Sequence, residues 1–299
     1  FGIDCSFISR NFKQADYVER QSGLCELALH NFPLLGLGHI RIHNRDGVSY
    51  LQEMLPVDCL FLDPARRDGH GGKTVAISDC EPDVTVLEPL LVDKAKKVMV
   101  KLSPMLDLSL ALNELKTVRA VHIVAVNNEC KELLLILQKE SVSSEVSIHC
   151  EHIAGNGESR HYTFTLKREK TSPCLLADEV GTYLYEPNAA ILKAGAFRSL
   201  TQTYPVAKLH LNSHLYTSVS LVPDFPGRRF RVEAVSGFGK KELKAFLMDM
   251  DKANITIRNF PLSVAELRKR LKLKEGGDDY IFATTLSGGQ KVLIRGKKC

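Results

Sequence analysis

Short apolar runs alternate with longer amphipathic stretches along the first 150 residues of the chain. The apolar runs predict strands over residues 15–19, 39–43, 58–63, 97–102 and 120–126. The amphipathic stretches predict helices over residues 5–12, 22–35, 48–54, 83–95, 107–116 and 128–139. Strands and helices in regular alternation are typical of βαβ units around a mostly parallel sheet. Because these strands are apolar on both faces, we expect helices to cover both sides of the sheet.

The second half of the chain shows a different pattern. Residues 145–153 and 160–167 flank the turn "AGNGES" and predict an antiparallel hairpin. A polar stretch at residues 168–173 and a proline-rich joint at residues 222–229 then divide the chain. We therefore predict three domains, at residues 1–168, 169–225 and 226–299, of which the last two are small α+β units. In the third, helices are expected over 240–250 and 263–273, and Ser263 with Glu266 forms a capping-box pattern at the start of the second.

Composition narrows the class of protein. The chain has 44% hydrophobic and 25% charged residues, which is ordinary for a globular protein, and no apolar run of membrane-spanning length. Its eight cysteines are scattered without a C-x-x-C pair, and its ten histidines show no metal-ligand spacing. We expect a cytoplasmic protein with reduced thiols, no membrane segment and no metal. The first residue is Phe, so we expect further sequence upstream of the first domain.

Charge is distributed unevenly along the chain. Residues 226–299 contain 17 Lys and Arg against 8 Asp and Glu, a net charge of +9, whereas the remainder has a net charge of −4. Such asymmetry indicates that the C-terminal part binds a polyanion. The alternative is a basic face that only contacts solvent.

Polar side chains follow each of the predicted strands. The strand ends carry Glu19-Arg20, Asp46-Gly47, Asp63-Pro64 and Ser103-Pro104. Ligands of open α/β sheets bind beyond the carboxyl ends of the strands. Carboxylates there can accept hydrogen bonds from the ribose hydroxyls and the adenine amino group of a nucleoside. A single acid at a strand end is more often a turn former, but three acids in one alternating pattern favour a ligand site.

These residues also carry a resemblance to a known family. Gly2-Ile3-Asp4, Tyr17-Val18-Glu19, Asp46-Gly47 and "LDPARR" (62–67) resemble the successive motifs of class I S-adenosylmethionine-dependent methyltransferases. More narrowly, "DPARR" and the later "VKLSP" (100–104) resemble the bacterial group that carries a C-terminal THUMP-like domain. The segments "YLYEPNAAILKAGAF" and "SGFGKKELKAFL" with the text after it are similar to that group's ferredoxin-like unit and THUMP-like domain. The resemblance covers essentially the whole chain and implies a Rossmann-like catalytic domain.

The resemblance implies roles for individual residues. Phe1-Gly2 would be the end of the glycine loop that passes under the methionine part of S-adenosylmethionine, where a side chain would collide. Glu19 would bind the ribose and Asp46 would lie near the adenine. The full set of cofactor-binding residues implied is Gly2, Asp4, Glu19, Arg20, Asp46, Gly47 and Asp63.

The "DPARR" loop would lie beside the transferable methyl group, with Asp63, Pro64 and Arg66 as its catalytic residues. In amino-methylating relatives an acid or amide, two prolines and an aromatic hold the target amine, so catalysis is mainly positioning. Here Ala65 and Arg66 replace the second proline and the aromatic. Arg66 and Arg67 would clamp a phosphate or carboxylate of the substrate, or form a structural ion pair with Asp68 or Asp79.

The basic C-terminal part would bind the substrate. Arg268, Lys269 and Arg270 belong to a predicted helix whose Leu267 and Leu271 face inward. Such a surface can follow a phosphate backbone without reading sequence. THUMP domains are associated with RNA, so the expected substrate is a tRNA or rRNA.

Two alternatives stay open: an inactive methyltransferase fold that only binds RNA, and a methyltransferase of a small molecule or protein. The methylated atom and the oligomeric state are also open.

Overall fold

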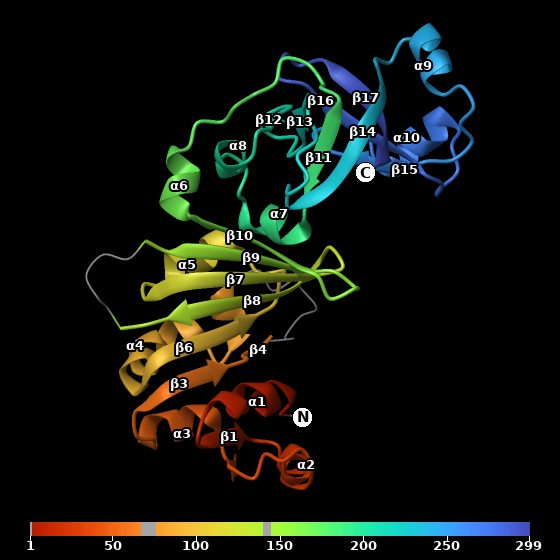
Figure 1. Cartoon of the computed structure of the whole chain (residues 1–299). Coiled ribbons are helices and arrows are strands. Elements are labelled where there is room, and N and C mark those ends of the chain that lie inside the picture. The colour runs from red at the N-terminus through yellow and green to blue at the C-terminus, as the bar shows by residue number, and fades with distance from the viewer. Residues whose placement is uncertain (1, 67–75, 140–144) are drawn as a thin grey trace. The chain divides into compact units, whose positions relative to one another are not determined.

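The computed structural model describes residues 2–66, 76–139 and 145–299 of the chain (Figure 1). The chain divides into two compact units. The N-terminal unit comprises residues 1–101, 105–118 and 136–141, and the C-terminal unit comprises residues 102–104, 119–135 and 142–299.

The N-terminal unit is built from parallel strand pairs joined by helices. Strand β1 (Ala15–Glu19) pairs in parallel with β2 (Ile40–Asn44), and α2 (Ser22–Leu34) connects them. Strand β3 (Val57–Leu62) pairs in parallel with β6 (Ala95–Leu102). The remaining elements are α1 (Ile3–Ile8), η1 (Ser9–Asn11), α3 (Gly47–Glu53), β4 (Ala65–Arg66), η2 (Ile77–Asp79), β5 (Cys80–Glu81), α4 (Val84–Lys94) and α5 (Leu108–Glu114). The strands and helices predicted for residues 5–116 are therefore present, with ends shifted by a few residues.

Three helices of this unit begin at an aspartate. The carboxylates of Asp46, Asp83 and Asp107 accept backbone N–H groups in the first turns of α3, α4 and α5. An aspartate at this position stabilises a helix by about 1 kcal/mol, because it satisfies an N–H group that has no partner within the helix. These caps place the start of each helix directly after the preceding strand or loop.

The helix predicted for residues 128–139 is wrong. Residues Glu129–Leu137 form strand β8, which lies next to β7 (Val118–Val126) in the sheet. Asn127 and Asn128 have φ angles of 51° and 63°, as in the two-residue turns that reverse a chain between antiparallel strands. The side chains of β8 alternate between more and less buried, which is the period of a strand. The Asn-Asn turn therefore overrides the helical preference of the Leu-rich segment.

The predicted hairpin is present in the C-terminal unit. Strands β9 (Ser147–Ile153) and β10 (Ser159–Thr165) pair antiparallel, and β9 also pairs in parallel with β7. Helix α6 (Leu166–Thr171) follows directly, so the domain boundary predicted after residue 168 falls inside a helix.

A seven-stranded sheet forms most of the remaining C-terminal unit (Figure 1). Its order is β12-β13-β11-β14-β17-β16-β15. Its strands, with the helices between them along the chain, are β11 (Tyr183–Pro187), α7 (Ala189–Ala194), α8 (Ser199–Thr203), β12 (Ala207–Lys208), β13 (Tyr216–Ser218), β14 (Gly227–Ser236), α9 (Lys240–Phe246), β15 (Asn254–Ile257), α10 (Val264–Leu271), β16 (Asp279–Thr285) and β17 (Lys291–Lys298). Because β11 pairs with β14, the second and third predicted domains share one sheet.

Gly227 lies where these two segments meet. A Cβ atom at this position would lie 2.1 Å from the backbone oxygen of Glu186, so only glycine allows β14 to pair with β11 here.

Each face of this sheet has its own core. Ile281 and Ala283 of β16 pack with Leu267 and Leu271 of α10 on one face. On the other face, Phe282 of the same strand packs in a separate cluster with Leu184, Leu209, Leu215, Phe230, Leu286, Val292 and Ile294. The alternation along β16 follows the two-residue period of a strand.

Candidate active site

The end of β6 brings together three charged side chains of the N-terminal unit. Lys101 Nζ lies 2.6 Å from Asp4 Oδ2 and 2.8 Å from Asp63 Oδ2. Asp4 belongs to α1 and Asp63 directly follows β3, the strand paired with β6. The Lys101 side chain is 20% exposed, whereas those of Asp4 and Asp63 are 44% and 51% exposed. The two carboxylates are therefore held from the protein side and remain accessible from outside.

The electrostatics of this cluster favour a bound cation. Burial by itself would lower the pKa of Lys101, but the hydrogen bonds and charges of Asp4 and Asp63 outweigh burial and raise it. Lys101 is consequently protonated throughout the physiological range. Two carboxylates against one ammonium group leave a net charge of −1, which attracts a positively charged ligand.

Gly2 positions Asp4 by starting α1. It has a φ of 67°, which favours glycine, and a Cβ atom there would lie 2.7 Å from Phe32 Cζ. The ring of Phe32 in turn packs edge-on against Tyr17 of β1. Glycine is thus required here by the chain's own aromatic residue, independently of the cofactor contact that the resemblance implies.

Glu19 and Arg20 form the turn after β1. Glu19 is partly buried, and its Oε1 accepts the backbone N–H of Gln21 at 2.8 Å. The Asn44 side-chain amide donates to the backbone oxygens of Glu19 and Arg20 at 3.0 and 3.1 Å. The ends of β1 and β2 are therefore fastened together, and one oxygen of the Glu19 carboxylate stabilises the turn.

Asp46 is exposed at the start of α3, after the end of β2. Its Oδ1 accepts hydrogen bonds from the backbone N–H and the hydroxyl of Ser49, at 2.9 and 3.0 Å. These hydrogen bonds lower the pKa of Asp46, and the positive charge of Arg20 lowers it further. Asp46 is therefore ionised and close enough to Arg20 to interact with its charge. The neighbouring Gly47 is not required sterically, since a Cβ atom there would meet nothing within 4 Å.

Arg20 links the end of β1 to the loop after Asp63. Its Nη1 lies 3.7 Å from Glu81 Oε1, and Glu81 of β5 pairs with Ala65 of β4. Pro64, between Asp63 and Ala65, is buried. The strands β1 and β2 form a two-stranded sheet separate from the one that contains β3 and β6, and the Arg20–Glu81 ion pair links the end of β1 to the loop after Asp63. We call Asp4, Glu19, Asp46, Asp63 and Lys101 the strand-end rim.

The structure leaves two predicted residues untested. The backbone of Arg66 is part of β4, but its side chain is outside the described part of the structure, as are Arg67 and Asp68. Contacts of Arg66 and Arg67 with a substrate, or with a structural partner, stay predictions.

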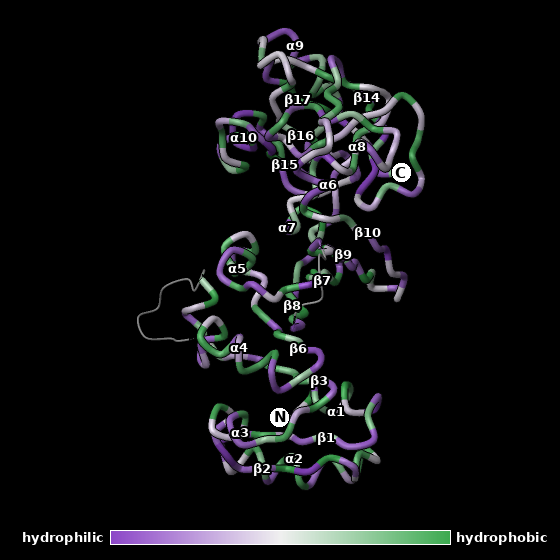
Figure 2. Tube along the Cα trace, turned by 90° about the vertical axis from the view of Figure 1, so that its left-hand side faces the viewer, coloured by the Kyte–Doolittle hydropathy of each residue, from purple (hydrophilic) through white to green (hydrophobic). Residues whose placement is uncertain are grey.

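The predicted basic helix is α10, and its capping box is confirmed. Ser263 and Glu266 exchange hydrogen bonds with each other's backbone N–H, and Leu267 and Leu271 are buried. Figure 2 shows the hydrophilic residues of this helix in purple. Arg268 and Arg270 point in different directions: Arg268 lines a cavity, whereas the Arg270 guanidinium lies 5.2 Å from the centre of the Phe238 ring.

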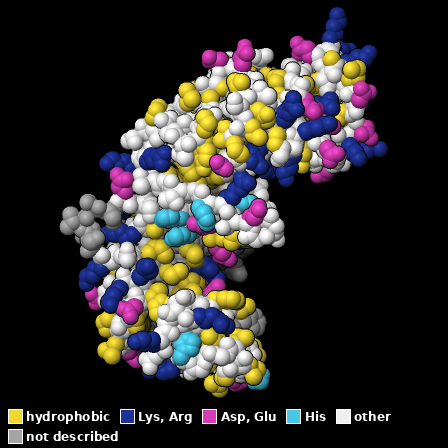
Figure 3. Space-filling view, in the orientation of Figure 1, with side chains coloured by type: hydrophobic (Ala, Val, Ile, Leu, Met, Phe, Trp, Pro, Cys, Tyr) yellow, Lys and Arg dark blue, Asp and Glu magenta, His cyan; other side chains and the backbone are white. Residues whose placement is uncertain are grey.

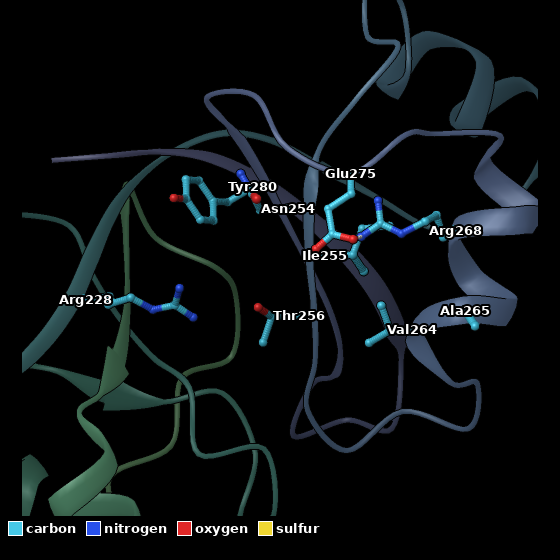
Figure 4. A pocket seen from close by; sticks show the side chains of 9 residues that line it. All are labelled: Arg228, Asn254, Ile255, Thr256, Val264, Ala265, Arg268, Glu275 and Tyr280. Atoms are coloured by element: carbon cyan, nitrogen blue, oxygen red, sulfur yellow. Dashed lines mark ion pairs between the residues drawn. The ribbon is translucent and has the colours of Figure 1, made fainter. Parts of the chain in front are cut away.

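The cavity beside Arg268 has a volume of about 590 Å³, within the usual range for a ligand site. Figure 4 shows Arg228 of β14, Thr256 of β15, Tyr280 of β16 and Arg268 of α10 around it. Arg228 is held by the buried Glu186, which also binds Arg258 through its other oxygen. Figure 3 shows Lys and Arg side chains, interspersed with acids, over this part of the C-terminal unit. The cavity therefore combines arginines, an aromatic ring, neutral polar groups and one acid, Glu275, which lies 4.0 Å from Arg268.

Comparisons with known proteins agree with these observations. Family models match a ferredoxin-like domain at residues 183–226 and a THUMP-like domain at residues 227–298. The chain is also similar to the crystal structure of a putative methyltransferase from Porphyromonas gingivalis W83. The TM-score is 0.86 and the identity 33%, over 100% of this chain and 80% of that chain. The chain belongs to this methyltransferase family. None of the curated proteins matches the chain.

Membership in this family confirms the α/β fold class and the resemblance seen in the sequence. The relative covers 100% of this chain, so the similarity also extends beyond the two C-terminal domains to the N-terminal unit. Within the described residues, no group of three or more His, Cys, Asp or Glu residues is arranged to hold a metal. No helix in the described part is long and apolar enough to span a membrane. All eight cysteines are free thiols.

Sequence reasoning missed Lys101 as a site residue. Lys101 stands inside the apolar run "KVMVKL" and within the segment "VKLSP", and neither pattern gives its side chain a role. A lysine one residue before the end of a buried strand, among parallel strands that end in acids, is the signal that could have identified it.

Proposed function

We propose that this methyltransferase transfers a methyl group from S-adenosylmethionine to RNA, at the strand-end rim of the N-terminal unit. The observation that carries the proposal is the pair of half-exposed carboxylates that Lys101 holds at the ends of two paired parallel strands. Family membership supports methyl transfer, and the THUMP-like domain supports RNA as the substrate.

The rim fits S-adenosylmethionine by charge and by hydrogen-bonding groups. The cofactor supplies an electrophilic methyl group on a sulfonium cation, which suits the net charge of −1 around Lys101. Glu19 and Asp46 would accept hydrogen bonds from the ribose and the adenine, and Gly2, Arg20 and Gly47 would contribute the backbone around them. Asp46 is exposed and ionised, as this role requires.

Asp63 would position the target atom. The hydrogen bond from Lys101 fixes one oxygen of its carboxylate, and Pro64 restricts the backbone that follows. A carboxylate fixed in this way can accept a hydrogen bond from a target amine or hydroxyl and orient its lone pair. Positioning of the reacting groups contributes several kcal/mol to catalysis, and the proton that the methylated amine or hydroxyl loses would pass to solvent beside the half-exposed Asp63. Arg66 and Arg67 would bind a phosphate of the same nucleotide.

The C-terminal unit would hold the RNA. Arg228 and Arg268 line one cavity, and Lys269 and Arg270 extend the positive surface of α10. Phosphate contacts of this kind supply affinity without sequence specificity. Free thiols suit a reducing compartment, so we place the reaction in the cytoplasm.

Transfer of label tests the proposal. The protein is incubated with methyl-labelled S-adenosylmethionine and total bacterial RNA, and the experiment is repeated with Asp63→Ala, which removes the group that would hold the target atom. We expect label in RNA with the unchanged protein and a strong loss with the variant. Label in protein or small molecules, with unlabelled RNA, would refute RNA as the substrate. RNA binding without any transfer would favour an inactive methyltransferase fold that binds RNA.

A further inference from the structure

A second cavity of the C-terminal unit contains a buried lysine. The cavity has a volume of about 230 Å³, and Lys208 of β12, Arg198 before α8 and Asn212 line it. Lys208 is only 2% exposed. Its backbone is fixed on both sides, because β12 pairs with β13 and the Lys208 N–H donates to the oxygen of Leu175. The position of its ammonium group is therefore set by the fold.

Lys208 is buried without an ion-pair partner among the residues that the structure describes. Its Nζ donates to the backbone oxygen of Leu211 and lies 5.0 Å from the centre of the Phe197 ring. Neither Lys208 nor Arg198 forms an ion pair with any carboxylate of the described residues. Burying a charge without an ionic partner costs several kcal/mol, and burial correspondingly lowers the pKa of Lys208. A charge retained at such a cost indicates a ligand that neutralises it.

The one acid that lines the cavity is already engaged. The carboxylate of Glu169 accepts the backbone N–H groups of Phe197, Arg198 and Ser199, at 2.8, 2.7 and 2.9 Å. Glu169 therefore fixes the turn before α8, and its negative charge acts on Lys208 without forming an ion pair with it. Nearby, burial together with the charges of Lys208 and Arg258 lowers the pKa of His214 to about 4. Lys208 and Arg198 together outnumber the one carboxylate, Glu169, so the charged side chains that line the cavity have a net charge of +1.

We propose that this cavity binds a phosphate group, with Lys208 and Arg198 as its cationic ligands and Asn212 as a neutral donor. Its volume of about 230 Å³ exceeds the roughly 30 Å³ of a water molecule several-fold, which leaves space for a tetrahedral anion. A nucleobase is a poor occupant, because His214 stacks on Phe197 with ring centres 3.7 Å apart and Lys208 lies over the same ring. The inference does not depend on the proposed methyl transfer. The phosphate would come from an RNA backbone or from a small phosphate monoester.

Binding of inorganic phosphate tests the site. The thermal unfolding of the full chain is followed in increasing phosphate, against chloride at equal ionic strength. We expect a saturable rise in the unfolding temperature. Arg198→Gln and Lys208→Met should each weaken the affinity about tenfold or more, as expected for loss of a charge-assisted hydrogen bond. Lys240→Gln, which neutralises an exposed lysine of α9, should respond like the unchanged protein.

The variants also separate binding from a structural role. If Lys208 neutralises a ligand, Lys208→Met without phosphate should unfold at the same temperature as the unchanged protein or higher. If that variant does not fold, Arg198→Gln decides, because Arg198 is exposed. A response to phosphate no greater than to chloride would overturn the proposal. Variants Arg198→Gln and Lys208→Met that respond to phosphate like the unchanged protein would also overturn it. So would a Lys240→Gln variant that loses the response to the same extent as they do.

Competition distinguishes the two sources of phosphate. Displacement of phosphate by a short RNA with a 5′-hydroxyl end would assign the site to an RNA backbone. Displacement by glycerol 3-phosphate and not by RNA would assign it to a small monoester. Both results support a phosphate site, and failure of both competitors would contradict it.

Discussion

Asp63 and Lys101 lie at the ends of two paired parallel strands, with Asp63 Oδ2 2.8 Å from Lys101 Nζ. Lys101 is less exposed than Asp63 and also binds Asp4. The lysine thereby sets the direction in which two carboxylates meet a ligand. We regard Lys101 as a positioning residue, since its ammonium group acts through Asp4 and Asp63.

Replacing Lys101 should impair transfer more than binding. In Lys101→Met the carboxylates of Asp4 and Asp63 lose their shared cation and repel each other. We expect the kcat of methyl transfer to fall about 10- to 100-fold, because small displacements of positioning groups have effects of this size. The KM for RNA should change little, since most of the affinity for RNA is proposed to come from the C-terminal unit. Steady-state kinetics with labelled cofactor measures both constants.

Lys96 of the same strand provides the control. It forms an exposed ion pair with Asp58, and such pairs contribute at most about 1 kcal/mol to stability. Lys96→Met should transfer methyl groups at the original rate. Equal losses in both variants would show that Lys101 has no special role.

Asp46→Asn separates the two roles of Asp46. Asparagine caps helices as well as aspartate, so the hydrogen bonds from Ser49 and the stability should be kept. Loss of the charge should weaken S-adenosylmethionine binding about 5- to 10-fold, because a charge-assisted hydrogen bond becomes a neutral one. Calorimetric titration measures the affinity. Unchanged affinity would mean that Asp46 is only a helix cap.

Gly2→Ala should destabilise the N-terminal unit. The new methyl group would lie 2.7 Å from Phe32 Cζ, and a φ of 67° is strained for alanine. We expect a loss of about 1–3 kcal/mol in the free energy of unfolding, measured by urea denaturation. The opposite sign is expected for Gly23→Ala, which lies in α2 with nothing within 4 Å and should gain about 0.5–1 kcal/mol. A Gly2→Ala variant as stable as the original would contradict the packing described for α1.

Two substitutions at the cavity beside α10 should change RNA affinity in opposite directions. Arg268→Gln removes a cation and should lower the slope of log affinity against log salt by about 1. Glu275→Gln removes the exposed acid 4.0 Å from Arg268 and should strengthen binding. Binding titrations at several salt concentrations measure both effects. If neither variant changes the salt dependence, RNA does not bind at this cavity.

Much of the N-terminal unit could be predicted because its signals are local. The apolar runs predict the strands, and the predicted acids follow the carboxyl ends of two parallel strand pairs, β1 with β2 and β3 with β6. The helix predicted for residues 128–139 was wrong because the Leu-rich segment suits a helix as well as a strand. The two asparagines before it form a turn that the sequence pattern did not indicate. A pair of non-glycine residues with positive φ is uncommon enough to be overlooked in sequence.

Contacts between segments that lie far apart in the chain could not be predicted from the sequence. Nothing near Gly2 shows that the ring of Phe32 lies against it, and nothing near Lys101 names Asp4 as its partner. The sequence pattern predicts that Arg268 and Arg270 belong to one basic surface of the helix. Positions two residues apart in a helix point in different directions, and the tertiary structure decides that Arg268 faces a cavity and Arg270 an aromatic ring.

Photochemical cross-linking of labelled S-adenosylmethionine tests the central claim most directly, because it locates the cofactor on the chain. The protein is irradiated with the labelled cofactor, with and without an excess of unlabelled cofactor, and the labelled peptides are identified by mass spectrometry. The account predicts label, removed by the excess, in peptides from residues 2–20, 44–47 or 61–66. Label confined to residues 183–299, or no label that the excess removes, would contradict a cofactor site at the strand-end rim.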